Sequence, residues 1–151
     1  MSYDSKQDTQ NHIKRVASLL KECSTELNRR GKVHDDSKLK TPEKELFDEY
    51  TPILSSLKYG SPEYFESLEK LKPALKHHYE NNTHHPEYYA NGIDGMNIFD
   101  IVEMLMDWKA ASERTDTGDI IKSIEFNKKR FNISDQLYSI LMNTANQMFK
   151  S

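Results

Sequence analysis

The apolar residues of this chain recur at the spacing of an α-helix, and this pattern constrains the fold more than any other feature. In the first part of the chain, Ile13, Val16, Leu20 and Leu27 fall on one helix face, and Gly31 follows as a stop signal. β-Branched residues never alternate with polar ones over the length of a strand. The sequence therefore predicts an all-α fold.

Helix start signals divide this pattern into separate helices. The triplets Thr-Pro-Glu at 41–43 and Ser-Pro-Glu at 61–63 each offer an N-cap, a proline in the first turn and an early acid. With the apolar spacing, they predict helices over about 8–30, 41–58, 61–80, 97–114, 119–130 and 134–149. Pro73 is expected to kink or break the third helix. Residues 81–97 are expected to form a loop with one helical turn at 86–90.

The helix over 97–114 is expected to be the most buried element of the fold. Its apolar positions recur at helical spacing and include the single tryptophan. We expect the buried face to consist of Ile98, Ile101, Val102, Leu105 and Trp108.

Length and charge limit the classes of protein to which the chain can belong. Its 151 residues predict one domain over 1–151, with a core over about 9–147. Lys and Arg total 21 against 24 Asp and Glu, so broad nucleic-acid binding is not expected. The single cysteine, Cys23, cannot form an internal disulfide, which favours a reducing compartment. We find no signal peptide or apolar span, and we expect a cytoplasmic protein without a membrane partner.

The six histidines are the most informative residues, and all of them lie before residue 86. His34 is followed at once by Asp35, and further along the chain Asp107 interrupts an apolar run. Imidazole and carboxylate are the usual ligands of Mn²⁺, Fe²⁺, Co²⁺ and Zn²⁺. A bound ion of this kind activates water and polarises a phosphoryl oxygen. The pattern therefore favours a hydrolytic metal site.

Each of these residues also has an ordinary structural explanation. A lone helical histidine such as His12 is commonly a partly exposed residue, and Asp35 and Asp36 could serve as N-caps. Asp107 could lie on the polar border of its helix. Taken singly, these explanations are the better ones. Taken together and in this order, the residues favour the metal site.

The order of these residues resembles the HD superfamily of metal-dependent phosphohydrolases. The carrying motifs are His-x-x-Arg-Val-Ala at 12–17, His-Asp-x-x-Lys at 34–38 and the aspartate at 107. More closely, the chain from about Thr9 to Asn146 resembles an uncharacterised HD-like family of bacteria and phages, through segments 34–39, 78–88 and 103–110. The resemblance implies a single-domain helical bundle of about six or seven helices. It implies a metal set of His12, His34, Asp35 and Asp107, and no particular substrate.

The histidine pairs at 77–78 and 84–85 go beyond this minimal set. Some HD branches with extra histidines hold two metals, including phosphodiesterases of the Gly-Tyr-Pro branch and mixed-valent di-iron oxygenases. The pair His84-His85 resembles that phosphodiesterase branch, but residues 86–95 lack the Gly-Tyr-Pro element, so cyclic-dinucleotide specificity is not inferred. Of His77 and His78, the His-Tyr pairing of the family favours His78. The predicted ligands are therefore His12, His34, Asp35, His78, His84, His85 and Asp107.

Four further residues are candidates for contact with a substrate. The resemblance places Lys38 near a substrate phosphate, although a solvated lysine explains it equally well. Asp36 occupies the variable position of the motif, and we assign it to catalysis as an acid or supporting group rather than as a ligand. Tyr79 and Tyr88 could stack on a nucleobase, with ordinary packing as the alternative.

The favoured function is a metal-dependent phosphohydrolase in which a metal-activated water attacks a nucleotide or a related small phosphoester. It would use one or two ions of Mn, Fe, Co or Zn, with Mg as a further option, and Asp35, Asp36 and Lys38 in catalysis. One alternative is an HD-type di-iron oxygenase. Another is a non-catalytic HD-like scaffold or phage-encoded inhibitor that binds a nucleotide or a host protein. The apolar C-terminal helix mildly favours a homodimer, and a phage-encoded chain would act in the host cytoplasm.

Overall fold

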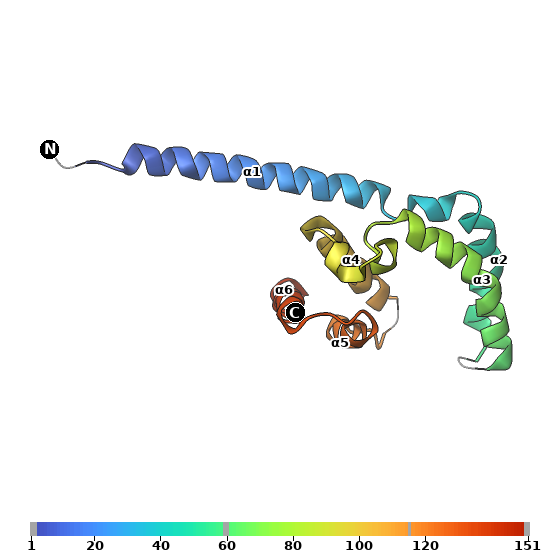
Figure 1. The fold of residues 1–151 in the computed structure, drawn as a ribbon. Helices are drawn as coiled ribbons and strands as arrows, with labels where there is room; N and C mark the ends of the chain where they lie inside the picture. The colour runs from blue at the N-terminus through green and yellow to red at the C-terminus, as the bar shows by residue number, and fades with distance from the viewer. Residues whose placement is uncertain (1–2, 59–60, 115, 150–151) are drawn as a thin grey trace. The chain divides into compact units, whose positions relative to one another are not determined.

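The computed structural model describes residues 3–58, 61–114 and 116–149, and within these ranges it is helical with no strand. The prediction of an all-α chain is confirmed. The long helices are α1 (Lys6–Val33), α2 (Glu43–Ser56), α3 (Pro62–Asn81), α4 (Ile98–Ser112), α5 (Ile120–Arg130) and α6 (Asp135–Phe149), as Figure 1 shows. Three short 3-10 helices connect them, η1 (Asp36–Leu39), η2 (Pro86–Tyr88) and η3 (Gly92–Gly95). None of the helices described is long and apolar enough to cross a membrane.

The chain divides into two compact units, Met1–His34 and Asp35–Ser151. The helix of the first unit is α1, which runs for 28 residues without a buried side chain. The apolar face predicted from the sequence is therefore exposed, with Ile13 at 59% and Leu20 at 64% of their full accessibility. The second unit contains all the other helices. The expected single domain over 1–151 stays a prediction.

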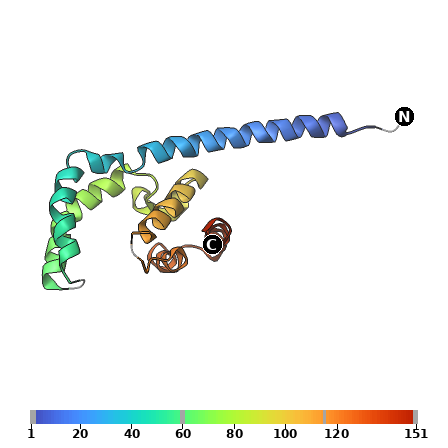
Figure 2. The ribbon, with the colours of Figure 1, turned by 180° about the vertical axis from the view of Figure 1, so that it is seen from behind.

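The apolar core of the second unit lies where α4, α5 and α6 meet (Figure 2). Met104 and Leu105 of α4, Ile124 of α5 and Leu141 of α6 are almost completely buried there. Ile98, which we expected on the buried face of α4, is instead 65% exposed. Periodicity identifies the face of a helix but not how far along that face its partner helices extend, and Ile98 is the first residue of α4.

Helices α2 and α3 pack against each other in the same unit (Figure 1). Ser61 caps α3 by accepting a hydrogen bond from the Tyr64 amide, and Pro62 occupies the first turn, as the sequence predicts. The expected break at Pro73 does not occur, and α3 runs without interruption to Asn81. Pro73 is exposed, so its ring faces solvent rather than a neighbouring helix. The last turns of α3 then carry His78 to the inner face of the unit.

Candidate metal centre

Asp35 is brought into the site by a tight turn. It is the first residue of the second unit, and its backbone adopts the left-handed conformation, with φ 58° and ψ 17°. Aspartate tolerates this conformation better than most residues because its short polar side chain can form local hydrogen bonds. The turn ends at η1, and the Asp35 side chain is left partly buried.

Three histidines approach Asp35 from α3 and from the loop that follows it. His78 lies in the last turn of α3, and His84 and His85 lie between that helix and η2. The residues His78 and His84 are 1% and 2% exposed, which is unusual for a side chain that can carry a charge. We call Asp35, His78, His84 and His85 the histidine cluster.

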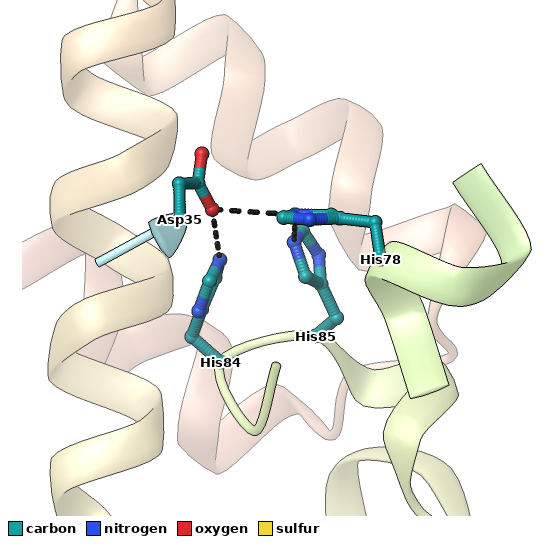
Figure 3. Close-up of side chains that lie close together, drawn as sticks. All are labelled: Asp35, His78, His84 and His85. Carbon is teal, nitrogen blue, oxygen red and sulfur yellow. Dashed lines mark hydrogen bonds and ion pairs between the residues drawn. The ribbon is translucent and has the colours of Figure 1, made fainter. Parts of the chain in front are cut away.

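The polar atoms of the histidine cluster converge on one point. Asp35 Oδ1 lies 3.2 Å from His78 Nε2 and 3.4 Å from His84 Nε2. The Nε2 atoms of His78 and His85 are 2.9 Å apart. One donor atom from each of the four residues lies within 4.8 Å of the other three. Figure 3 shows the four side chains pointing toward one another.

The electrostatics of the histidine cluster favour the protonation states that bind a cation. Burial would raise the pKa of the Asp35 carboxyl, but hydrogen bonds with His78, His84 and Lys38 lower it far below its usual range. Burial lowers the pKa of His85 to about 3, helped by the neighbouring rings of His84 and His78. At neutral pH the cluster thus pairs an ionised carboxylate with a neutral imidazole at His85. These are the states in which both groups ligate metals.

The chemistry of this donor set fits a divalent transition metal. Three imidazole nitrogens and one carboxylate oxygen suit Mn²⁺, Fe²⁺, Co²⁺ or Zn²⁺, whereas Mg²⁺ prefers oxygen ligands throughout. A cation at the point of convergence would also neutralise the buried charge of Asp35. These four residues could therefore hold one such ion.

A family model described as a family of unknown function (DUF5662) matches residues 1–147, which is nearly the whole chain. The chain belongs to the DUF5662 family. No curated protein and no solved structure matches it. Because the description of DUF5662 carries no activity, the function of the DUF5662 chain has to be argued from its site.

Asp107 of the DUF5662 chain lies on α4, close to the histidine cluster. One of its carboxylate oxygens is within 4.8 Å of a ring nitrogen of His84, and its charge raises the pKa of His85 against the effect of burial. His12 and His34 belong to the first unit, and their part in the metal site stays a prediction.

Two of the four predicted substrate residues of the DUF5662 chain, Lys38 and Tyr79, contact the histidine cluster. Lys38 Nζ lies 2.7 Å from Asp35 Oδ2, so it forms an ion pair with the cluster rather than standing free in solvent. The ring of Tyr79 is next to that of His85, with centroids 4.9 Å apart. Tyr88 is 43% exposed and contacts the edge of Tyr89. Asp36 begins η1 and is not one of the four converging residues.

Two glutamates of the DUF5662 site were not predicted from the sequence. Glu43 Oε2 lies 2.9 Å from His78 Nδ1, and Glu103 Oε1 lies 3.2 Å from His84 Nδ1. In the sequence, Glu43 is an ordinary acid in the first turn of a helix, and Glu103 is one of several acids in the helix over 97–114. The one available signal was the position of Glu103 four residues before Asp107, which places both on one helix face.

Proposed function

We propose that this DUF5662 chain is a metal-dependent phosphohydrolase that cleaves a nucleotide or a related phosphoester. The observation that carries the proposal is the convergence of three imidazole nitrogens and one carboxylate oxygen, with His78 and His84 buried and Asp35 and His85 partly buried. The resemblance of residues 12–17, 34–38 and 107 to the HD superfamily supports a hydrolytic use of such a site. In this proposal His12, His34 and Asp107 add ligands for the same ion or for a second one.

The residues of the cluster have separate tasks in this reaction. When bound, the cation would lower the pKa of a water molecule and polarise a phosphoryl oxygen. Asp35 supplies the negative charge that holds a divalent ion among neutral imidazoles. The Lys38 ammonium lies 2.7 Å from Asp35 and is partly exposed to solvent, so it can also contact a phosphate oxygen. Tyr79, whose ring packs on His85, would contact the rest of the substrate in this proposal.

Metal content and turnover together test the proposal. Elemental mass spectrometry would measure the ions bound per chain after reconstitution with Mn²⁺, Fe²⁺, Co²⁺ or Zn²⁺. Phosphate release would then be followed with nucleotides and a generic phosphodiester. We expect one or two ions per chain and metal-dependent release in the wild type, and loss of both in Asp35→Asn. Asp94→Asn makes the same chemical change at an exposed position and is the matched control.

Three outcomes would contradict the proposal. The first is that no divalent ion binds after reconstitution. The second is that Asp35→Asn retains full metal-dependent turnover. The third is oxygen consumption in the iron-loaded protein without phosphate release, which would instead support the di-iron oxygenase.

A further inference from the structure

Glu43 is the most deeply buried carboxylate in contact with the histidine cluster, and it is completely inaccessible to solvent. An ionised carboxylate in such a place is strongly destabilising unless several donors reach it. Three donors do so, because His77 Nδ1 lies 2.7 Å from Oε1, while His78 Nδ1 at 2.9 Å and Ser37 Oγ at 3.0 Å contact Oε2. Burial raises the pKa of the Glu43 carboxyl, but these hydrogen bonds outweigh it and the pKa lies below its usual value.

A carboxylate at Nδ1 decides which nitrogen of His78 carries the proton. An ionised carboxylate only accepts hydrogen bonds, so His78 must present Nδ1–H to Glu43. Its other nitrogen, Nε2, faces Asp35 Oδ1 at 3.2 Å and His85 Nε2 at 2.9 Å, and with the proton held on Nδ1 a cation at this point can take the place of any proton on Nε2. This is the tautomer in which Nε2 can bind a metal.

The other polar neighbours of His78 Nδ1 favour the opposite tautomer. The amide nitrogen of Asn82 lies 3.1 Å from Nδ1 and can only donate. Ser37 Oγ, also at 3.1 Å, donates its single proton to Glu43 and could donate to Nδ1 only when that acceptor is removed. The Asn82 amide also donates to Ser37 Oγ at 2.8 Å and to the His78 carbonyl at 2.7 Å. Without Glu43, the Ser37 hydroxyl could turn to Nδ1 while Asp35 Oδ1, 3.2 Å from Nε2, draws the proton to Nε2, where it would block metal binding.

We infer that Glu43 is a positioning residue that fixes His78 in the Nδ1–H tautomer and so presents His78 Nε2 to the metal. Glu103 has the same relation to His84, because its Oε1 lies 3.2 Å from His84 Nδ1. Two carboxylates from different helices, α2 and α4, thus contact the Nδ1 atoms of two histidines of the cluster. The metal-binding part of this inference rests on the proposed function, whereas the tautomer assignment does not.

Nitrogen NMR on the metal-free chain tests the inference without any variant. In ¹⁵N-labelled protein at about pH 8, where an ordinary histidine is neutral, long-range ¹H–¹⁵N correlations distinguish Nδ1–H from Nε2–H in each ring. We expect His78 and His84 both to carry the proton on Nδ1. A His78 ring without a proton on Nδ1 in the wild type would overturn the inference, even if the protein binds metal and hydrolyses phosphoesters.

Paired variants then show which carboxylate controls which ring. Glu43→Met removes both oxygens while keeping a side chain of similar length, and it should move the proton of His78 to Nε2 and leave His84 unchanged. Glu103→Met should do the reverse. His77→Ala removes the other partner of Glu43, on Oε1, and should leave His78 as it is in the wild type. A His78 tautomer that is unchanged in Glu43→Met would overturn the inference.

Metal affinity connects the tautomer to the site. Competition with a chelator for Zn²⁺ or Mn²⁺ should show a loss of about 10–100-fold in Glu43→Met, the usual effect of removing a carboxylate behind a metal-binding histidine. Unchanged affinity in a folded Glu43→Met chain would overturn the positioning role. A wild type that keeps the Nδ1–H tautomer but binds no divalent ion would refute the proposed function and leave the assignment of Glu43 standing.

Discussion

Helix α4 contributes side chains to two interiors of different chemistry, the apolar core and the polar region of the histidine cluster. Met104 and Leu105 face the apolar core, where they pack with Ile124 and Leu141. On the same helix, Glu103 contacts His84 and so belongs to the histidine cluster. The buried side chains of the first interior are apolar, whereas the second contains several buried groups that can carry charge.

The difference between the two interiors shows where stability and function reside. Burying apolar area stabilises the folded chain without any ligand. Burying carboxylates and imidazoles stabilises it only to the extent that each is hydrogen-bonded or binds a cation. A chain that needed stability alone would gain nothing from the second interior, so we attribute the histidine cluster to function. The predictions below test whether the two interiors respond separately.

The largest expected loss of stability lies in the apolar core. Ile124 is completely buried, and Ile124→Ala would remove contacts and leave a cavity between α4, α5 and α6. We expect the free energy of unfolding to fall by about 2–5 kcal/mol, measured by urea denaturation of the metal-free chain. The metal affinity of the remaining folded protein should not change. A large loss of affinity would mean that the two interiors are coupled through α4.

Metal should stabilise the chain through the histidine cluster, whatever further ligands contribute. A ligand that binds only the folded state at a hundred times its dissociation constant adds about 2.7 kcal/mol. We expect a rise of this order in the wild type with Zn²⁺ or Mn²⁺, and in Ile124→Ala as well, measured by denaturation with and without the ion. His84→Ala should abolish it, because one of the converging nitrogens is lost. A full metal-dependent rise in His84→Ala would exclude this cluster as the binding site.

Tyr89 tests a partly buried polar contact that lies outside the cluster. Its hydroxyl donates to Asp100 Oδ2 at 2.7 Å, and burial together with this bond raises its pKa from 10.0 to about 12. The unfolded chain therefore loses this proton near pH 10, while the folded chain keeps it until near pH 12. The stabilisation is complete below about pH 10 and disappears as the pH rises through the folded value.

Replacement of Tyr89 should therefore matter least at high pH. We expect Tyr89→Phe to cost about 1 kcal/mol at pH 8, and the difference from the wild type to shrink above about pH 10. Denaturation at several pH values measures both quantities. A difference that stays constant through this range would show that the phenol does not titrate as its contacts require.

An effect as small as that of Tyr89→Phe is expected at the N-terminus of α4, the helix that both interiors share. The Asn97 side chain accepts hydrogen bonds from the backbone amides of Phe99 and Asp100. In turn, the Asp100 carboxylate accepts a hydrogen bond from the Asn97 backbone amide. Asn97→Ala should lower the free energy of unfolding by about 1 kcal/mol, measured by thermal or urea denaturation. Metal affinity should stay the same. A marked fall in affinity would show that the cluster depends on the exact placement of α4.

The helices of this protein were largely predictable because their signals are local. The Ser61-Pro62 start, the Asp119 cap of α5 and the apolar spacing of α4 to α6 each act within a few residues, and the structure shows helices at all of these positions. Three local expectations were wrong: Thr41 does not cap α2, whose N-cap is Pro42, α3 continues through Pro73, and Ile98 is exposed. The exposure of Ile98 depends on how far the neighbouring helices extend, which no local pattern contains.

Four of the residues predicted as metal ligands, Asp35, His78, His84 and His85, lie together in the structure, but their arrangement was not predictable. They were named from their residue types, their order and the resemblance to the HD superfamily. The partnership of Glu43 with His78 spans 35 positions in the chain and joins two helices. A glutamate in the first turn of a helix has the same local sequence whether it faces solvent or a buried histidine.

Local sequence thus decided the helical character of the chain and the chemical types that gather at one site. Tertiary structure decided that the side chain of His78 is buried and that Glu43 and Glu103 contact the Nδ1 atoms of His78 and His84. It also decided which face of α4 packs in the apolar core. The physical reason is one of range. Helix signals act between residues three or four positions apart, whereas burial and tautomer choice depend on groups that meet only after the chain has folded.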